Sequence, residues 1–430
     1  MKNIAIIGSG VSGLTAAYLL SKKHQVSVFE KGDVIGGHTA TVDVEVEGKP
    51  YAIDTGFIVF NNKTYPNYLA LLDEIGVGKQ KTEMSFSVHN TKTKLEYNGH
   101  NLNTLFAQRR NILRPKFWHL VKEILRFNKL CKEVFESEKF NETDTLGDFL
   151  SCHDFSQFFA EHYILPMGAA IWSSSLTQME GFQFRFFVRF FHHHGLLNIA
   201  DRPQWYVIPN GSRSYLEPLC KPFANNIKVN TNIKYITRNN DKVQIHFNAE
   251  DNVDTHLEEF DEVVVACHSD QALALLGDPT PEEKAILSAM PYSENSVVLH
   301  TDINLLPQRK KAWASWNYQL SEHRDKPASV TYNMNILQGL ISSKHTFCVT
   351  LNQRESIAPE KILREFTYHH PIFSLASISA QQQRDEICGQ RHTHYAGAYW
   401  HSGFHEDGVR SAVEVAQRFA CFLSQPTPKA

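Results

Sequence analysis

The sequence predicts an α/β protein whose N-terminal part is a Rossmann-type dinucleotide-binding unit. An apolar run over residues 4–7 leads into the glycine-rich segment 8–13, which reads GSGVSG, and a helix-like segment follows over residues 14–20. A second apolar run over residues 26–29 ends in Glu30. A strand, a glycine-rich turn, a helix and an acid at the end of the second strand are the consecutive parts of a dinucleotide site. A glycine-rich turn in an ordinary α/β unit is the alternative interpretation.

The residues of this unit have separate physical roles in such a site. Gly8 makes the sharp turn, Gly10 lets backbone N–H groups approach a pyrophosphate, and Gly13 lets helix and strand pack closely. The pyrophosphate is expected at the positive end of the helix. Glu30, roughly twenty residues past Gly8, is placed to accept hydrogen bonds from a ribose diol. The neighbours that we also assign to cofactor binding are Ser9, Ser12 and Lys31.

Length, charge and cysteine usage limit the class of protein. At 430 residues the chain is long enough for more than one domain and a large core. Its net charge of −3 offers no argument for nucleic acid, and no nucleic-acid partner is expected. Seven cysteines without a CxxC pair predict reduced thiols in a reducing compartment. No apolar run approaches a membrane span, and the first predicted strand begins beside Met1, which leaves no room for a signal peptide. We therefore expect a cytoplasmic protein, with peripheral membrane contact left open.

The next segments carry a family resemblance. They are a Gly36-Gly37 pair, an alternating stretch over residues 42–48 that predicts a hairpin arm, and residues 54–57, which read DTGF. Together with the glycine-rich turn they resemble the FAD-dependent amine oxidoreductase superfamily, which includes monoamine oxidases, protoporphyrinogen oxidase and phytoene desaturases. The resemblance implies FAD as the cofactor. It also implies that the following residues approach the flavin and its diphosphate: Gly36, Gly37, His38 (where the family usually has a basic residue), Thr39, Thr55, Gly56 and Phe57.

The end of the chain carries a second signal of the same family. Residues 394–412 resemble its C-terminal flavin motif, in which a strand ends in Ala-Gly and a glycine opens a helix after a loop. The N-terminus of that helix would present its positive end to the flavin C2 carbonyl, where negative charge accumulates on reduction. The family commonly has an acid at the position of Ala398, and Glu406 or Asp407 are the candidates to replace it. The resemblance assigns cofactor contacts to Gly397, Gly408, Val409 and, beside the adenine, Ile233.

The resemblance implies a discontinuous, Rossmann-type FAD-binding domain with an α+β substrate domain inserted into it. An apolar run within residues 260–267 predicts a buried parallel strand of the FAD-binding domain. This domain is predicted from residues 1–60, 204–275 and 391–430, and the substrate domain from residues 61–203 and 276–390.

Two stretches of the inserted part carry further hypotheses. Residues 105–139 predict a long helical stretch interrupted near Pro115, and its many basic residues beside apolar ones suit either a solvated face or an anionic lipid surface. Residues 182–194 include six phenylalanines within ten positions, which either core packing or the wall of an apolar cavity would explain. The three histidines at residues 192–194 end this run, but consecutive helical residues point in different directions, so no metal site is expected.

The leading hypothesis is an FAD-dependent oxidoreductase that removes hydride from an apolar substrate and desaturates a fatty-acyl or other lipid chain. It rests on a resemblance to a bacterial branch of the superfamily that is linked with enzymes modifying fatty-acyl chains. His405, on the loop that opens the flavin-facing helix, is the candidate acid/base residue because imidazole titrates near neutrality; a His405 that only hydrogen-bonds its loop is the competing interpretation. Phe404 lies near the position of an aromatic-cage residue in amine-oxidising relatives. A flavin amine oxidase and a non-catalytic flavoprotein, acting as a redox sensor or lipid-binding partner, are the alternatives.

Overall fold

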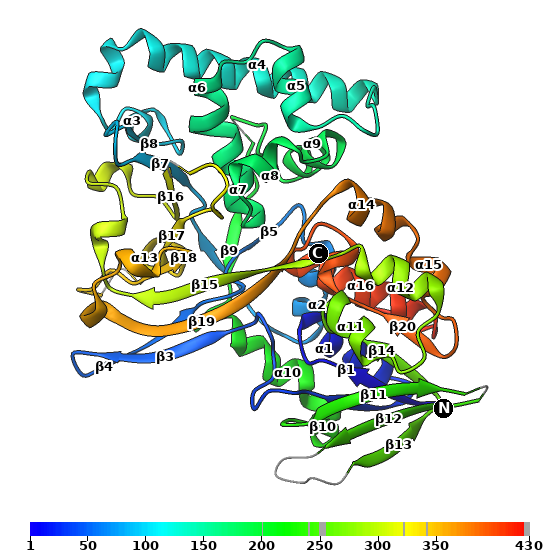
Figure 1. Cartoon of the computed structure of the whole chain (residues 1–430). Coiled ribbons are helices and arrows are strands. Elements are labelled where there is room, and N and C mark those ends of the chain that lie inside the picture. The colour runs from blue at the N-terminus through cyan, green and yellow to red at the C-terminus, as the bar shows by residue number, and fades with distance from the viewer. Residues whose placement is uncertain (200, 240, 249–254, 321–322, 341–342, 425–430) are drawn as a thin grey trace, which may run out of the picture.

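The fold is a mixed α/β arrangement that contains a five-stranded parallel sheet (Figure 1). The computed structural model describes residues 1–199, 201–239, 241–248, 255–320, 323–340 and 343–424. The strand order is β10-β2-β1-β14-β20, and Ile6 of β1 pairs with both Val28 and Val264. Strand β14 is the buried parallel strand that the sequence predicts. The bounds are β1 Asn3–Ile7, β2 Gln25–Phe29, β10 Ile227–Lys228, β14 Glu262–Val265 and β20 Thr393–Tyr395.

Helix α1 follows β1 directly and packs on β1 and β2, and the C-terminal helix α16 packs along α1 (Figure 1). A three-stranded antiparallel sheet, β11-β12-β13, occupies the connection between β10 and β14. The bounds of the elements in this part are α1 Val11–Ser21, α2 Pro66–Glu74, α10 Leu216–Cys220, β11 Asn232–Arg238, β12 Val243–Asn248, β13 His256–Phe260, α11 Ser269–Leu275, α12 Pro281–Ser288, α14 Leu375–Gln382, α15 Arg384–Ile387 and α16 His405–Gln417.

A seven-stranded sheet, ordered β19-β15-β18-β17-β16-β7-β8, forms the second large sheet. Its pairs are antiparallel except for β16 and β7, which run parallel. Its strands come from both segments predicted for the substrate domain, whereas the strands of the five-stranded sheet come from all three segments predicted for the FAD-binding domain; the domain boundaries themselves stay predictions. The bounds are β7 Phe86–Asn90, β8 Glu96–Asn98, β15 Tyr292–His300, β16 Trp316–Leu320, β17 Val330–Asn333, β18 Cys348–Leu351 and β19 Ile362–Pro371.

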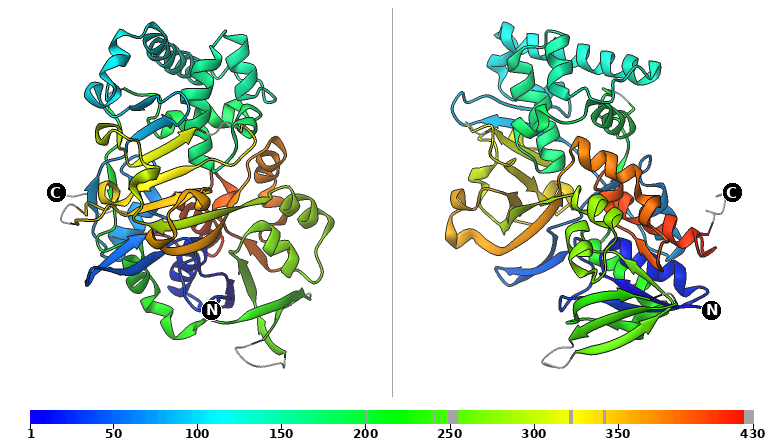
Figure 2. Two further views of the ribbon diagram at one scale, coloured as in Figure 1. Left: turned by 60° about the vertical axis from the view of Figure 1, so that its left-hand side comes forward. Right: turned by 45° about the vertical axis from the view of Figure 1, so that its right-hand side comes forward.

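A group of helices lies at the end of the molecule opposite the β11-β12-β13 sheet, as both views of Figure 2 show. The interruption predicted near Pro115 is confirmed, because a short 3₁₀ helix over Arg109–Leu113 ends before α4 begins at Pro115. None of the helices in the described part of the chain combines the length and apolar character that a bilayer crossing requires. The bounds are α3 Leu102–Leu105, α4 Pro115–Ser137, α5 Leu146–Cys152, α6 Gln157–Phe159, α7 Leu165–Trp172, α8 Leu176–Glu180 and α9 Phe184–His193. The short helix α13 (Met334–Leu337) lies apart from this group, beside β17 of the seven-stranded sheet (Figure 1).

Two small antiparallel sheets complete the fold. The hairpin expected near residues 42–48 is confirmed as β3 (Thr41–Val46) and β4 (Lys49–Asp54), with Gly48 in its turn at a φ of 72°. Strand β9 (Trp205–Val207) pairs with two short strands from the preceding part of the chain, β5 Phe60–Asn61 and β6 Gln80–Thr82.

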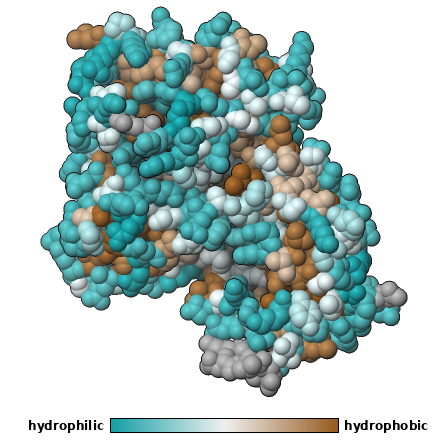
Figure 3. Space-filling model, viewed as in Figure 1, coloured by the Kyte–Doolittle hydropathy of each residue, from teal (hydrophilic) through white to brown (hydrophobic). Residues whose placement is uncertain are grey.

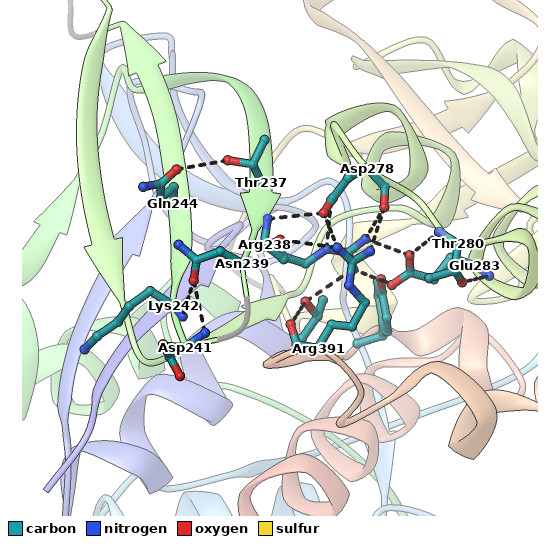
Figure 4. Close-up of polar contacts among 12 residues, drawn as sticks. Thr237, Arg238, Asn239, Asp241, Lys242, Gln244, Asp278, Thr280, Glu283 and Arg391 are labelled. Carbon is teal, nitrogen blue, oxygen red and sulfur yellow. Dashed lines mark hydrogen bonds and ion pairs between the residues drawn. The ribbon is translucent and has the colours of Figure 1, made fainter.

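A buried ion network ties the antiparallel sheet to the C-terminal part of the fold (Figure 4). The side chain of Arg238, the last residue of β11, is fully buried. Its guanidinium donates to the Glu283 carboxylate (Nη2 to Oε2, 2.8 Å) and to Asp278 (Nε to Oδ1, 3.0 Å). Tyr395 of β20 donates a further hydrogen bond of 2.6 Å to Glu283. Burial alone would raise the pKa of the Glu283 carboxyl, but the bonds from Arg238 and Tyr395 hold it below its ordinary value. The buried Arg238 guanidinium therefore links four segments: β11, the residues before α12, α12 itself and β20.

Replacing Arg238 by Met should lower the free energy of unfolding by about 3–5 kcal/mol, because Glu283 would stay buried without a counter-charge. The measurement is urea unfolding followed by circular dichroism. The matched control is Arg354→Met, which breaks an exposed pair with Glu365 and should cost about 0–1 kcal/mol. Equal unfolding midpoints for the two variants would show that the network does not hold these segments together.

Candidate active site

One cavity of about 1120 Å³ is lined by residues of the five-stranded sheet at one end and of the seven-stranded sheet and helices α7 and α9 at the other. It passes the carboxyl ends of β1, β2 and β14. The chain leaves β1 toward β2 on one side, while β14 lies on the other side of β1, so the strand order reverses here. This switch point is where open α/β sheets bind their ligands.

Close packing brings the N-terminus of α1 to the cavity wall. A Cβ on Gly13 would lie 1.9 Å from the Gly8 carbonyl oxygen, so only glycine lets α1 approach β1 this closely. The N-cap residue Gly10 lines the cavity and provides no side-chain cap, which leaves first-turn N–H groups for an anion. A Cβ on Gly10 would meet no atom within 4 Å. The turn therefore has both the donors and the room that a pyrophosphate needs.

Glu30 lies on the cavity wall beside the same turn. Its Oε2 accepts hydrogen bonds from the Ser9 backbone N–H (3.0 Å) and hydroxyl (2.6 Å), and its Oε1 accepts one from the Gly32 backbone N–H (2.8 Å). These bonds hold the carboxylate at the end of β2, where a ribose diol is expected. The predicted residues Ser12, Lys31 and Ile233 line this end of the cavity as well.

The segments expected at the flavin converge further along the cavity. A Cβ on Gly56 would lie 2.2 Å from the His38 carbonyl oxygen, so the two loops touch. Helix α16 begins here, with Phe404 as its N-cap, and its positive end therefore opens on the cavity. The predicted residues that line this region are Gly36, Gly37, His38, Thr39, Thr55, Gly56, Phe57, Gly397, Phe404 and His405. Turn, acid and second helix end follow one another along one cavity, as an extended FAD requires.

Three residues predicted to contact the cofactor are absent from the described lining: Gly13, Gly408 and Val409. Val409 is fully buried. A Cβ on Gly408 would lie 2.6 Å from Val11 Cγ1 of α1, so this glycine allows α16 to pack on α1. Gly13 has the packing role that the sequence assigns to it, whereas the contacts that the resemblance implies for Gly408 and Val409 are corrected, because both lie beneath the cavity wall.

The two acids considered as substitutes at the Ala398 position are engaged elsewhere. Glu406 accepts hydrogen bonds from the backbone N–H groups of Asn67 (3.0 Å) and Tyr68 (2.8 Å), at the start of α2. Asp407 accepts one of 2.9 Å from the backbone N–H of Phe404 and so caps its own helix. Both carboxylates therefore fix helix N-termini, and neither lines the described part of the cavity.

The His405 ring is fixed in place by contacts with neighbouring side chains. Its ring stacks on Phe57 with 3.6 Å between centroids, and its Nε2 lies 2.8 Å from the Tyr215 hydroxyl, which also lies 2.7 Å from the Thr39 hydroxyl. Burial, with His38 nearby, lowers the pKa of His405 to about 3. The expectation that it titrates near neutrality is therefore wrong. The hydrogen bond to Tyr215 fits the competing interpretation, in which His405 positions the loop before α16.

Other histidines gather on the wall around His38. The centroid of its ring lies 5.9 Å from that of His370 and 6.2 Å from that of His268. Burial lowers the pKa of His38 to about 3 and that of His370 to about 4, so both are neutral at pH 7. Within the described chain no group of three or more side chains has metal-binding geometry. Because His38 Nε2 is buried without a hydrogen-bond partner, it remains available to a bound group.

Sequence reasoning missed four residues of this region: Tyr215, His268, Tyr368 and His370. His268 follows β14 closely at the carboxyl edge of the sheet, and that position was a usable signal. Tyr368 belongs to β19, and its hydroxyl lies 2.9 Å from that of Thr55. No local motif identifies Tyr215, Tyr368 or His370, because their place at the site depends on contacts with distant segments.

The end of the cavity away from the glycine-rich turn is aromatic. The phenylalanines of α9 divide between two roles: Phe187 and Phe191 are buried in the core, whereas Phe190 lines the cavity and stacks on Phe404 with 4.9 Å between centroids. Both explanations of the phenylalanine run, packing in the core and forming a cavity wall, are therefore correct. The other apolar and aromatic residues at this end are Phe86, Tyr97, Tyr163, Met167, Ile171, Trp172, Trp205, Trp316, Tyr332 and Phe373.

Comparisons with known proteins agree with this geometry. A family model described as flavin containing amine oxidoreductase matches residues 11–329. A 1-hydroxycarotenoid 3,4-desaturase of Flavobacterium sp. (strain P99-3) is 41% identical over 98 residues, which are 23% of this chain and only 18% of the desaturase. Among solved structures, a CLA-producing fatty acid isomerase from P. acnes matches with a TM-score of 0.67 at 16% identity, over 97% of this chain and 98% of the other. Cyclohexylamine oxidase from Brevibacterium oxydans IH-35A matches with a TM-score of 0.69 at 13% identity, over 97% and 99%.

Gly10→Ala should weaken flavin binding at least about tenfold while leaving the fold intact, because its methyl group would enter only the space beside the pyrophosphate. The measurement is flavin absorbance per protein after dialysis, together with the melting temperature. Gly78→Ala is the matched control, since a Cβ there also meets no atom within 4 Å and Gly78 does not line the cavity. Full flavin retention by Gly10→Ala would contradict the assignment of the pyrophosphate to this turn.

The His405 imidazole should stay neutral from pH 8 down to about pH 5, because burial disfavours its cation. The measurement is a ¹⁵N-histidine NMR titration, with the His405 signal assigned by its loss in His405→Gln. Below pH 6.5 the unfolded chain takes up a proton here that the folded chain refuses, so this group lowers the free energy of unfolding as the pH falls toward 3. A His405 midpoint near 6.5 would restore its candidacy as an acid/base residue.

Proposed function

The chain belongs to the flavin containing amine oxidoreductase family, and we propose that this FAD-dependent oxidoreductase desaturates a fatty-acyl or other lipid chain. FAD, when bound, supplies the hydride acceptor. The protein's own task is then to bind an apolar chain, to exclude water and to align one C–H bond. The residues that line the cavity support these separate roles of cofactor and protein.

The observation that carries the proposal is the low charge of the aromatic end of the cavity, whose described lining has no carboxylate and one cation, the exposed Arg202. Across the described lining the only carboxylate is Glu30, which lies at the glycine-rich turn. The basic lining residues are Lys31, at that same end, and Arg202, which is exposed. A saturated chain gains free energy when it leaves water for such a wall, at roughly 25 cal/mol per Å² of apolar surface buried.

The histidines on the wall do not change this polarity. Burial lowers the pKa of His194 to about 4, as it does for His370. The Nδ1 of His370 lies 2.9 Å from the Ser173 hydroxyl, and this contact fixes the orientation of the ring. Neutral imidazoles therefore add no charge to the cavity wall.

The names of two similar proteins support a lipid as the substrate. One is called a carotenoid desaturase and another a fatty acid isomerase, and both substrates are apolar chains. An amine oxidase is the second candidate, favoured by the name of the family and by the likeness to cyclohexylamine oxidase. Against it, an ammonium group would find no carboxylate at the aromatic end of the described cavity.

The deciding experiment is an anaerobic single-turnover screen of the flavin-loaded protein. We expect acyl phospholipids or free fatty acids to bleach the flavin absorbance and amines to leave it unchanged. Bleaching by amines but never by acyl lipids would reject the desaturase proposal in favour of the amine oxidase.

A charge placed on the aromatic wall should separate the two candidates further. Ile171 lines the cavity from α7, and Ile171→Asp should slow bleaching by an acyl chain at least about tenfold, because burying a carboxylate beside a chain costs well over 1 kcal/mol. The same variant should favour a cationic amine. Ile171→Leu is the control and should retain the wild-type rate; an unchanged acyl rate in Ile171→Asp would show that the chain binds elsewhere.

A further inference from the structure

The molecule carries an exposed apolar surface at the end formed by α3 and α4, which we define as the α3–α4 surface. Its most exposed apolar side chains are Leu113, at 86% exposure, and Leu102, at 75%. Ile112, Trp118 and Leu125 are each more than 40% exposed. Figure 3 shows apolar residues set among hydrophilic ones along this upper edge of the molecule. A group of large apolar side chains exposed to solvent indicates a surface that binds a protein or a membrane.

The α3–α4 surface is predominantly basic: its exposed acids, Glu133 and Glu136, lie near the C-terminal end of α4, where Glu133 pairs with Lys129 at 3.7 Å. Between residues 101 and 132 the sequence contains one acid, Glu123, which is 4% exposed and accepts a 2.7 Å hydrogen bond from the Ser156 backbone N–H. Its negative charge therefore points into the fold. The basic residues of the same stretch are exposed except for the half-buried Lys132; they are Arg109, Arg110, Arg114, Lys116, Lys122, Arg126, Lys129 and Lys132.

Helix α4 sorts its residues between two faces. Phe117, Leu120 and Phe127 are buried against the other helices. On the outer side, Trp118, Lys122, Leu125 and Lys129 are exposed at spacings of four, three and four residues, which places them on one face. Apolar and basic groups thus alternate along a single outward stripe.

One residue of the cavity lining reaches the molecular surface just before α3. Gly99 lines the cavity and is itself exposed, in the turn between β8 and α3. Leu102 follows three residues later, and Tyr97 of β8 continues the lining inward. An apolar chain held at the α3–α4 surface would have a short path to the aromatic end of the cavity.

We propose that the α3–α4 surface docks on an anionic phospholipid bilayer and that the cavity takes an acyl chain directly from that bilayer through the opening at Gly99. The second half of this statement rests on the proposed function; the docking itself does not. Leu102, Leu113 and Trp118 enter the interfacial layer, and the lysines and arginines around them face the phosphates. Basic residues near an anionic leaflet and aromatic side chains at its interface each favour this placement.

A bilayer fits this surface better than a folded protein partner. The exposed apolar side chains are distributed over three helical segments, α3, the 3₁₀ helix and α4, and none of them lines the cavity. Protein interfaces deplete lysine at their cores, whereas Lys122 and Lys129 alternate with the apolar residues along the stripe. Alternating apolar and basic side chains suit the surface of a bilayer, where phosphate headgroups lie beside acyl chains.

The test is sedimentation of the flavin-loaded full chain with lipid vesicles. Vesicles of phosphatidylcholine mixed with phosphatidylglycerol should retain the protein, with binding that weakens as salt rises, and vesicles of phosphatidylcholine alone should retain much less. The double variant Lys122→Glu with Lys129→Glu should bind at least about tenfold more weakly, since each basic residue near the leaflet contributes on the order of 1 kcal/mol. Leu113→Ser should weaken binding to both kinds of vesicle.

Matched controls lie on the antiparallel sheet at the opposite end of the molecule. Lys234→Glu and Leu257→Ser change exposed residues of β11 and β13, and both variants should bind as the wild type does. Absence of vesicle binding, or equal losses in the control variants, would overturn docking and would favour an acidic protein as the partner of this surface.

A second readout separates docking from chemistry. Flavin bleaching by acyl lipid presented in vesicles should slow in the Lys122→Glu, Lys129→Glu double variant, while bleaching by the same lipid in neutral detergent should match the wild type. Equal rates in both presentations would overturn uptake from the bilayer. If no lipid bleaches the flavin in either form while vesicle binding persists, the proposed function and the uptake fail together and the docking stands.

Discussion

The site depends on how closely three elements approach one another: β1, α1 and α16. Gly13 lets α1 lie against the turn after β1, and Gly408 lets α16 lie against α1. A single methyl group at either glycine would approach its neighbour to 1.9 Å or 2.6 Å, well inside van der Waals contact. Because both helices are held this tightly, two helix N-termini from opposite ends of the chain open on one cavity. Their positive ends and free N–H groups provide what an anionic cofactor requires.

This arrangement explains why the cavity needs few charged side chains. The wall around His38 is neutral at the position where the family usually has a basic residue, since burial keeps its histidines deprotonated. Glu30 and Lys31 are confined to the nucleotide end, and the aromatic end is uncharged in its described interior. The buried charges of the Arg238 network are paired with one another, and a concentration of basic residues lies on the outer side of α4. An uncharged interior beside a basic, apolar exterior suits a substrate that arrives from a lipid phase.

Local patterns in the sequence predicted local structure well. The hairpin β3–β4, the buried strand β14 and the start of α4 at Pro115 each follow from alternation, an apolar run or a proline over a few residues. The errors concern residues whose environment is set by distant segments. His405 belongs to a helix start that the sequence locates, but Phe57 and Tyr215 bury it and lower its pKa. Glu406 was a candidate near the flavin, and the N-terminus of α2 engages it instead.

The sequence by itself determined the family, the FAD-type architecture and the position of both glycine-rich segments, because these are short motifs in which spacing alone encodes the geometry. It assigned Gly13 to helix–strand packing, but it assigned Gly408 to cofactor contact rather than to packing on α1. Only the tertiary structure decided that they lie beneath the wall, that His405 is neutral, and that Tyr215, Tyr368 and His370 join the site. The reason is physical: exposure, pKa and cavity shape are set by what the rest of the fold packs against a residue, and that information is absent from its neighbours in the chain.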